Sequence, residues 1–191
     1  MPNKIFIISG PSGSGQDSII EELKKILPLT RVITTTTRPK RPGEKSGRPY
    51  YFVSRKNFLT GIAKNKFLEY AKEYNDNYYG VTFSEIQRIK KTGKIGIWKI
   101  EYQGVTTVKK IMPEIVSILI TAPLSVLEKR IKARDKDKAT KKYLSERMAY
   151  TKKWLKHKNL YDYEVANLQG KLPQAVKKTS QIIKNHLRNE G

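Results

Sequence analysis

The 191-residue chain is predicted to fold as an α/β domain, with a parallel sheet covered by helices on both faces. Three nearly continuous apolar runs, at residues 5–9, 95–101 and 115–121, are typical of strands buried on both faces. Each run is followed by apolar residues at helical spacing, as in Ile19, Leu23 and Leu27. A glycine-rich turn follows the first run. Ligands of such folds bind at the carboxyl ends of the strands, so we expect the functional site there.

The loop after the first strand has the layout of a phosphate-binding loop, which is a strand, a glycine turn and a helix N-terminus. The usual pattern is G-x-x-x-x-G-K-[ST], and Gly10 and Gly15 match its two glycines. Gln16 stands at the lysine position and Asp17 at the hydroxyl position that holds magnesium. A glycine turn without a ligand is the alternative. The expected phosphate-binding residues are Gly10, Pro11, Ser12, Gly13, Ser14, Gly15, Gln16, Asp17 and Ser18.

The composition excludes several classes of function. The chain contains 39 Lys and Arg against 17 Asp and Glu, a net charge of +22, which attracts nucleotides and nucleic acids alike. The lysines are spread over predicted helix surfaces without a nucleic-acid-binding motif, so specific nucleic-acid recognition is not expected. There is no cysteine and only two histidines, which excludes disulfides and thiolate chemistry. We expect a cytoplasmic protein without a membrane partner, because no apolar run reaches membrane-spanning length. No signal peptide is expected, because the given sequence goes straight into the first strand.

The middle of the chain interrupts the alternation of strands and helices. Residues 34–44 contain two prolines and a glycine and are expected to form a loop. A strand at 50–53, a short helix at 58–65, two strands at 67–74 and 77–81, and a helix at 82–91 follow. Thr82 and Glu85 have the spacing of a capping box. We therefore predict an inserted α+β subdomain at about residues 35–93, and a core formed by residues 1–34 and 94–191.

The C-terminal half continues the core. A helix at 124–133 precedes a charged segment at 134–138, and a long helix is expected from about 140 to 157. Residues 161–167 are expected to form the last strand and a turn. Pro173 suits the first turn of a terminal helix, because proline lacks the N–H that this position leaves unpaired.

Seven motifs follow one another along the chain: GPSGSG at 10–15, TTRPKRPGE at 36–44, YYFV at 50–53, FLE at 67–69, NYYG at 77–80, QGV at 103–105 and YDY at 161–163. With these independent motifs in the family's order, the chain resembles the guanylate kinase family along nearly its whole length. The family transfers a phosphoryl group from ATP to GMP with magnesium, and the resemblance therefore implies ATP, GMP and Mg²⁺ as ligands. It also implies that the inserted subdomain binds GMP and that a lid lies at about residues 134–142.

The resemblance also implies roles for individual residues. It assigns the phosphate of GMP to Arg38, Arg41, Tyr50 and Tyr79. Glu69 is expected to accept the N1 and N2 hydrogens of guanine, and Thr34 and Glu101 to lie near the base. On the ATP side, Arg134 and Arg147 match lid arginines that reach the transferred phosphate, and Asn167 matches a residue near adenine. Three of these residues, taken singly, also have an interpretation without a ligand. Tyr79 is then an aromatic residue that packs a small sheet, Arg147 a surface charge and Glu69 an exposed residue of an edge strand.

Departures from the family pattern concentrate at the ATP side. Besides Gln16 and Asp17, Lys99 stands where the family has an aspartate, and Val81 replaces a small hydroxyl residue. We predict an exchange of charges, in which Lys99 supplies the missing cation and Asp17 holds magnesium. The expected catalytic residues are thus Asp17, Lys99, Arg134 and Arg147. The alternative is a strand-end lysine that faces water, paired loosely with Glu101 or Asp17.

Two functions of different class follow. The first is an active guanylate kinase with a rearranged phosphate site. The second is a catalytically weak or inactive relative that binds nucleotide, or a phosphorylated partner, in the GMP cleft. A basic nucleic-acid binder is a third possibility, which requires an affinity that survives physiological salt. The sequence leaves the donor preference and the oligomeric state open.

Overall fold

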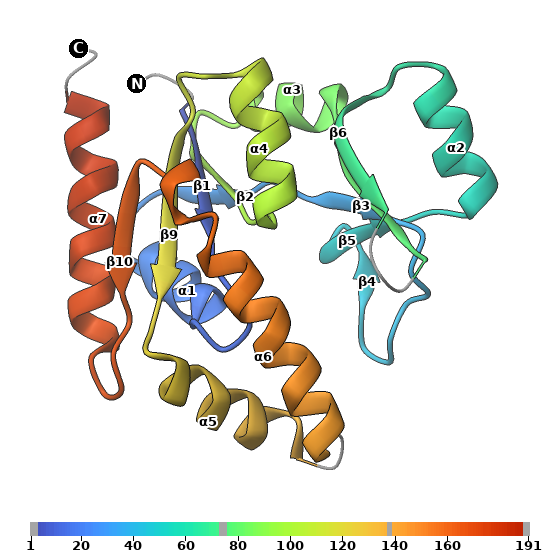
Figure 1. The fold of residues 1–191 in the computed structure, drawn as a ribbon. Coiled ribbons are helices and arrows are strands. Elements are labelled where there is room, and N and C mark those ends of the chain that lie inside the picture. Colours follow the sequence, from blue (N-terminus) through green and yellow to red (C-terminus); the bar gives the residue numbers. More distant parts are fainter. Residues whose placement is uncertain (1–3, 73–75, 137–138, 189–191) are drawn as a thin grey trace.

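The computed structural model describes residues 4–72, 76–136 and 139–188. Five strands form a core sheet in the order β10-β9-β1-β8-β2, and every neighbouring pair is parallel (Figure 1). The predicted α/β class with a parallel sheet is confirmed. The strands are β1 (Ile5–Ser9), β2 (Leu29–Arg31), β8 (Ile95–Trp98), β9 (Val116–Thr121) and β10 (Tyr163–Ala166).

Helices cover both faces of this sheet. Alternate residues of a strand point to opposite faces, so Phe6 and Ile8 join one core cluster while Ile5 and Ile7 join the other. The first cluster is completed by α1 (Gln16–Ile26) and α7 (Leu172–Arg188), the second by α3 (Phe83–Lys91) and α4 (Tyr102–Ile111). Each fully buried side chain of the size of isoleucine or phenylalanine contributes roughly 1.5–3 kcal/mol to the stability of the fold. None of the described helices is long and apolar enough to cross a membrane.

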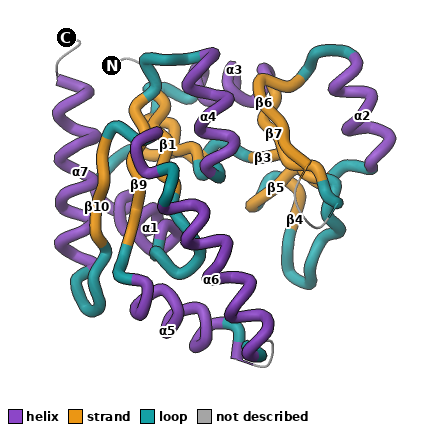
Figure 2. Tube along the Cα trace, viewed as in Figure 1, coloured by secondary structure: helices purple, strands orange, loops and turns teal. Residues whose placement is uncertain are grey.

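A second sheet is inserted between β2 and β8, beside the core (Figure 2). Its strand order is β4-β5-β3-β7-β6, and β7 runs antiparallel to both of its neighbours. The helix α2 (Arg55–Ala63) begins at Ser54, whose hydroxyl accepts a hydrogen bond from Asn57 N. The strands are β3 (Thr34–Thr36), β4 (Lys45–Ser46), β5 (Pro49–Phe52), β6 (Phe67–Lys72) and β7 (Tyr78–Thr82).

Two expectations about strand limits are wrong. Residues 34–36 form β3 in the middle of the second sheet and not a loop, because three β-branched threonines precede the first proline and pair with β5 and β7. The strand expected at 95–101 ends at Trp98. The carbonyl of Ile100 accepts a hydrogen bond of 2.6 Å from the Ser9 hydroxyl. Lys99 and Glu101 therefore lie beyond the strand, at its carboxyl end.

The remaining helices lie past the carboxyl ends of the core strands (Figure 1). They are α5 (Leu124–Arg134) and α6 (Lys141–Leu155), and a 3₁₀ turn, Lys158–Leu160, follows α6. The Tyr143 hydroxyl donates a 2.7 Å hydrogen bond to Asp135, which joins the start of α6 to the end of α5. The lid predicted at about 134–142 includes residues 137–138, which lie outside the described residues, and it stays a prediction.

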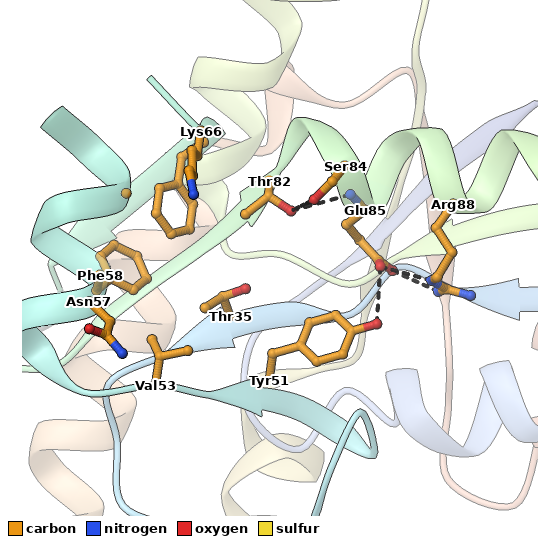
Figure 3. A pocket seen from close by; sticks show the side chains of 12 residues that line it. Thr35, Tyr51, Val53, Asn57, Phe58, Lys66, Thr82, Ser84, Glu85 and Arg88 are labelled. Atoms are coloured by element: carbon orange, nitrogen blue, oxygen red, sulfur yellow. Dashed lines mark hydrogen bonds and ion pairs between the residues drawn. The ribbon is translucent and has the colours of Figure 1, made fainter. Parts of the chain in front are cut away.

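Glu85 connects the core to the second sheet. Its backbone N–H donates to the Thr82 hydroxyl, as the capping box predicts. Its carboxylate, only 2 % exposed, instead accepts from Ile33 N at 2.7 Å and from the Arg88 guanidinium at 2.7 and 2.8 Å. Figure 3 shows Glu85 between Tyr51 and Arg88 at one end of a pocket of about 380 Å³. This buried carboxylate is already paired with a guanidinium and a backbone N–H, so we interpret it as structural.

Replacing Glu85 by alanine is expected to lower the free energy of unfolding by about 2–3 kcal/mol, because a buried N–H and a guanidinium lose their acceptor. Urea unfolding followed by circular dichroism measures this. Glu128→Ala, at an exposed site on α5, is the control and should change stability by less than about 0.5 kcal/mol. Equal effects of the two substitutions would contradict the structural role of Glu85.

Candidate active site

The loop between β1 and α1 is shaped by glycines at positions where a side chain cannot be placed. Gly15 is the N-cap of α1 with φ +87°, and a Cβ there would lie 2.3 Å from Asn167 Nδ2. Gly13, with φ +82°, would place a Cβ 2.8 Å from the carbonyl oxygen of Leu127. Left-handed φ values of this kind favour glycine. The loop therefore brings its backbone to the positive end of the α1 dipole, a geometry suited to anions.

Polar side chains support the loop from inside. The buried Gln16 amide donates a hydrogen bond to the carbonyl oxygen of Gly10, across the loop. Asn167, 3 % exposed, donates to the carbonyl oxygen of Ser14 at 2.8 Å. Among the described residues, neither Ser14 Oγ nor Asn167 Oδ1 has a hydrogen-bond partner, which is uncommon for buried oxygens. The loop is thus held by Gln16 at the start of α1 and by Asn167 just after β10, and it keeps unused polar atoms.

A cavity of about 550 Å³ lies between this loop, the second sheet and the helices α5 and α6, a volume usual for small-molecule sites. It brings together residues predicted for both substrates. All nine residues predicted at the loop, 10–18, line it. The other predicted residues in its lining are Thr34, Tyr50, Glu69, Tyr79, Lys99, Glu101, Arg134 and Arg147.

Three predicted residues are not part of the described cavity lining. Arg38 forms a 2.8 Å ion pair with Glu44, and its guanidinium lies 5.4 Å from the ring centroid of Tyr50. Arg41 is exposed, and its backbone N–H donates to the same Glu44 carboxylate at 2.8 Å. Asn167 lies behind the loop, as described above. Glu44 therefore fixes the segment that carries both arginines, next to a tyrosine of the cavity wall.

Glu69 is a buried carboxylate without a cationic partner among the groups that shift its pKa. It is 6 % exposed and lies on β6, so the interpretation as an exposed edge residue is wrong. Burial raises the pKa of Glu69 to about 7, and a backbone hydrogen bond from Val81 opposes this rise. Gly104 of α4 lies beside it, since a Cβ built there would make an ordinary contact of 3.5 Å with Glu69 Oε2. Such a carboxylate is ready to accept N–H donors from a ligand.

Glu101 is the second acidic group of the cavity. It is the N-cap residue of α4, and its carboxylate accepts a hydrogen bond from the Tyr150 hydroxyl of α6. Burial raises the pKa of Glu101, an effect opposed by Tyr150, Arg147 and Lys99. Glu101 thus joins the strand end at β8 to the helix that carries Arg147.

Asp17 in the first turn of α1 is held by two cations. Lys99 Nζ lies 2.6 Å from Asp17 Oδ2, and Arg31 Nη2 lies 2.6 Å from Oδ1. Partial burial raises the pKa of Asp17, but these two cations outweigh it and the pKa lies below its usual range. Lys99 thus pairs with Asp17, as one interpretation expects, and both line the cavity, as the predicted exchange of charges requires. Their roles stay predictions.

The arginines of α5 and α6 surround the loop. Arg134 donates to Ser12 Oγ at 3.1 Å, and Arg147 donates to the Tyr143 hydroxyl at 3.1 Å. Arg130, which the motifs did not single out, lines the cavity and donates to the carbonyl oxygens of Gly13 and Leu168, both at 3.2 Å. Its spacing from Arg134 is the available signal, because residues four apart share a helix face.

Among residues 10–18 of the loop, Asp17 provides the carboxylate that a magnesium ion would use as a ligand. Within the described ranges, no group of three or more His, Cys, Asp or Glu side chains is arranged to hold a metal ion. Magnesium at phosphates usually takes only one or two carboxylates from the protein, so a single aspartate at the loop suits it. Both oxygens of Asp17 are engaged by cations, however, and an ion pair has to open before a metal binds there.

Comparisons with known proteins agree with this geometry. The sequence model of one family, guanylate kinase, matches residues 2–186. The chain is 39% identical to the guanylate kinase of Rickettsia prowazekii over 181 residues, 94% of this chain and 89% of that protein. It is 39% identical to that of Hydrogenovibrio crunogenus over 169 residues, 87% of this chain and 81% of that protein. A crystal structure of guanylate kinase from Anaplasma phagocytophilum has a TM-score of 0.71 at 26% identity, covering 98% of this chain and 85% of that one. The chain belongs to the guanylate kinase family.

Proposed function

We propose that this protein transfers a phosphoryl group from ATP to GMP, giving ADP and GDP. One observation carries the proposal: the cavity that contains the phosphate-binding loop also contains the buried carboxylate of Glu69. A loop that holds phosphates and a pocket that selects a base are the two requirements of a nucleotide kinase. Family membership supports the same reaction.

The acceptor side selects guanine through Glu69. Guanine presents N1–H and N2–H donors to this carboxylate, whereas adenine has no hydrogen on N1 and leaves the buried group without a full set of partners. Thr34 and Glu101 lie on the same cavity and complete the base site. Tyr50 and Tyr79 provide hydroxyls for the phosphate of GMP. Arg38 and Arg41 reach that phosphate from the neighbouring segment, which Glu44 holds in place.

The donor side holds the phosphates of ATP. Phosphoryl transfer depends on positioning and on neutralising charge, which a backbone cradle and arginines supply. The loop provides the cradle, and Arg130, Arg134 and Arg147 surround it. Asn167 supports the loop on the side assigned to adenine. Magnesium, when bound with ATP, neutralises phosphate charge, and Asp17 is its candidate protein ligand.

A second function rests on a specific observation. The Gln16 amide is engaged with Gly10 and carries no charge, so the loop lacks the cation that kinases of this type place there. A catalytically weak relative that binds nucleotide or a phosphorylated partner in the same cleft is the alternative. Turnover decides between the two.

The reaction is tested by a coupled assay of ADP formation with ATP and Mg²⁺, offering GMP, AMP, UMP or no acceptor. We expect GMP-dependent ADP formation well above the other three. Equal use of AMP and GMP would refute guanine selection. Absence of GMP-dependent turnover, with GMP still bound in calorimetry, would favour the binding protein.

Glu69→Gln is expected to lower kcat/KM for GMP by about 30- to 150-fold, because the amide replaces one charge-assisted acceptor with a donor that faces the donors of guanine; this corresponds to roughly 2–3 kcal/mol. Steady-state kinetics at fixed, saturating ATP measure the loss. Glu128→Gln, on the exposed face of α5, is the matched control and should leave kcat/KM unchanged. A loss shared by both variants would contradict the assignment.

The same substitution should stabilise the free protein at neutral pH. In the folded state the pKa of Glu69 is about 7 against an ordinary 4.5, so the folded protein holds a proton that the unfolded chain releases. Wild-type stability therefore falls between about pH 4.5 and 7, by roughly 3 kcal/mol, and Glu69→Gln should be free of this decline. Urea unfolding of both proteins at pH 5, 6, 7 and 8 measures the difference. Parallel curves would show that Glu69 has an ordinary pKa.

A further inference from the structure

The phosphate-binding loop of this chain contains no cation of its own. Gln16 is neutral, and its amide already donates to the carbonyl oxygen of Gly10. The next residue, Asp17, places a negative charge in the first turn of α1, in the lining of the same cavity as the loop. A triphosphate at this loop therefore needs positive charge from another element of the fold.

The parallel sheet places two cations beside Asp17. The strands β1, β8 and β2 are neighbours, and their carboxyl ends lie at the same edge. The loop that follows β1 leads to Asp17, Lys99 comes directly after β8, and Arg31 is the last residue of β2. The separations of 2.6 Å on both carboxylate oxygens are those of charge-assisted hydrogen bonds.

The two cations occupy different sides of Asp17. Lys99 belongs to the described lining of the cavity, together with Asp17, whereas Arg31 is not part of it. The Arg31 side chain is 28% exposed and that of Lys99 39%. Arg31 thus neutralises the carboxylate from outside the cavity. The group as a whole keeps one positive charge, and the cation that faces the loop is Lys99.

An ammonium group has three donors, and Asp17 occupies one of them. Within the part of the chain that the structure describes, the ammonium makes no other hydrogen bond, so two donors remain for phosphate oxygens at the loop. The aspartate holds the long, flexible lysine stem close to the loop, which reduces the entropy lost when a phosphate binds. The Asp17 side chain is 61% exposed, so what distinguishes this ion pair from others at the surface is that both of its members line the cavity beside the loop.

We propose that Lys99 supplies the cation of the phosphate-binding loop, contacting the β-phosphate of the donor nucleotide, and that Asp17, clamped by Arg31, is its positioning residue. The proposal deepens the proposed function by naming the residue that binds the donor phosphates. It competes with the predicted role of Asp17 as magnesium ligand, because both uses need the same carboxylate oxygens.

The first experiment measures binding without turnover. Calorimetry in EDTA compares ADP with AMP for the wild type, Lys99→Met and Lys94→Met. Lys94 lies just before the amino end of the same strand, exposed, and is the matched control. Lys99→Met should weaken the binding of ADP by about 10- to 100-fold, which corresponds to the loss of one charged hydrogen bond to the β-phosphate. The binding of AMP, which has no β-phosphate, should weaken by less than about 3-fold. The control should bind both as the wild type does. Unchanged ADP affinity of Lys99→Met, or an equal loss for AMP, overturns the proposal.

A second pair of variants separates the charge from the fold. Gln16→Lys in the Lys99→Met background returns a cation to the loop and should recover at least part of the lost ADP affinity in EDTA. No recovery means that Lys99 does not act as the cation of the loop. GMP binding, which uses the other end of the cavity, should persist in every variant and reports that each is folded.

Asp17→Asn distinguishes the positioning role from a metal ligand. If Asp17 positions Lys99, the ratio of ADP affinities with and without Mg²⁺ stays within about 3-fold of the wild-type ratio, because magnesium is held by phosphates and water. If Mg²⁺ no longer changes the ADP affinity of Asp17→Asn, so that this ratio is one, Asp17 is the metal ligand and its positioning role is refuted. These measurements need no catalysis. If the wild type makes no GDP, the proposed reaction fails while the role of Lys99 in ADP binding is still decided.

Discussion

The site depends on one constraint, the alignment of the carboxyl ends of the parallel strands at a single edge of the core sheet. Residues 17, 31 and 99 are far apart in sequence and belong to three different elements, yet they meet because β1, β8 and β2 are adjacent and parallel. The Ser9 hydroxyl adds a further link at this edge, donating to the carbonyl oxygen of Ile100. A change of strand order would separate every one of these groups.

The buried carboxylates of the chain differ in how they are compensated, and this difference separates structure from function. Glu85 has a guanidinium and a backbone N–H within 2.8 Å, and joins two parts of the fold. Glu69 is similarly buried, but only a backbone hydrogen bond opposes the rise of its pKa. Burying a carboxylate without a cation costs stability, and such a cost is usually found at binding sites. Cations are abundant in a chain with a net charge of +22, so the lack of a cation among the groups that shift the pKa of Glu69 points to a binding site.

Aromatic residues connect α6 to the same edge of the core sheet. The Trp154 indole donates to the Tyr161 hydroxyl at 3.1 Å, and that hydroxyl lies 2.9 Å from Ser9 Oγ. Tyr150 donates to Glu101, just after β8. The helix that carries Arg147 is therefore anchored at its C-terminal half, where Trp154 is buried. Its N-terminal half contacts α5 through Tyr143 and Asp135. This arrangement leaves the arginines of the two helices facing the loop.

The sequence by itself determined the class of fold and most of the elements, because continuous apolar runs and helical spacing report burial directly. It also indicated the loop, since the glycines at 13 and 15 are required by backbone φ and by close contacts. It did not determine where strands end: the threonines at 34–36 joined a sheet through pairing with distant residues, and β8 stopped at Trp98. Arg130 was missed although its spacing from Arg134 pointed to it.

Only the tertiary structure decided the state of each charged group. Whether Glu69 is exposed or buried, and whether Lys99 faces water or Asp17, depends on residues tens of positions away in sequence, and local patterns carry no information about them. Electrostatic energies depend on distance and on solvent exposure, and both are set by packing. The residue types at the site, including Lys99 as the candidate cation, were therefore readable from the sequence. The joint pairing of Asp17 with Lys99 and Arg31, and the burial of Glu69, required the fold.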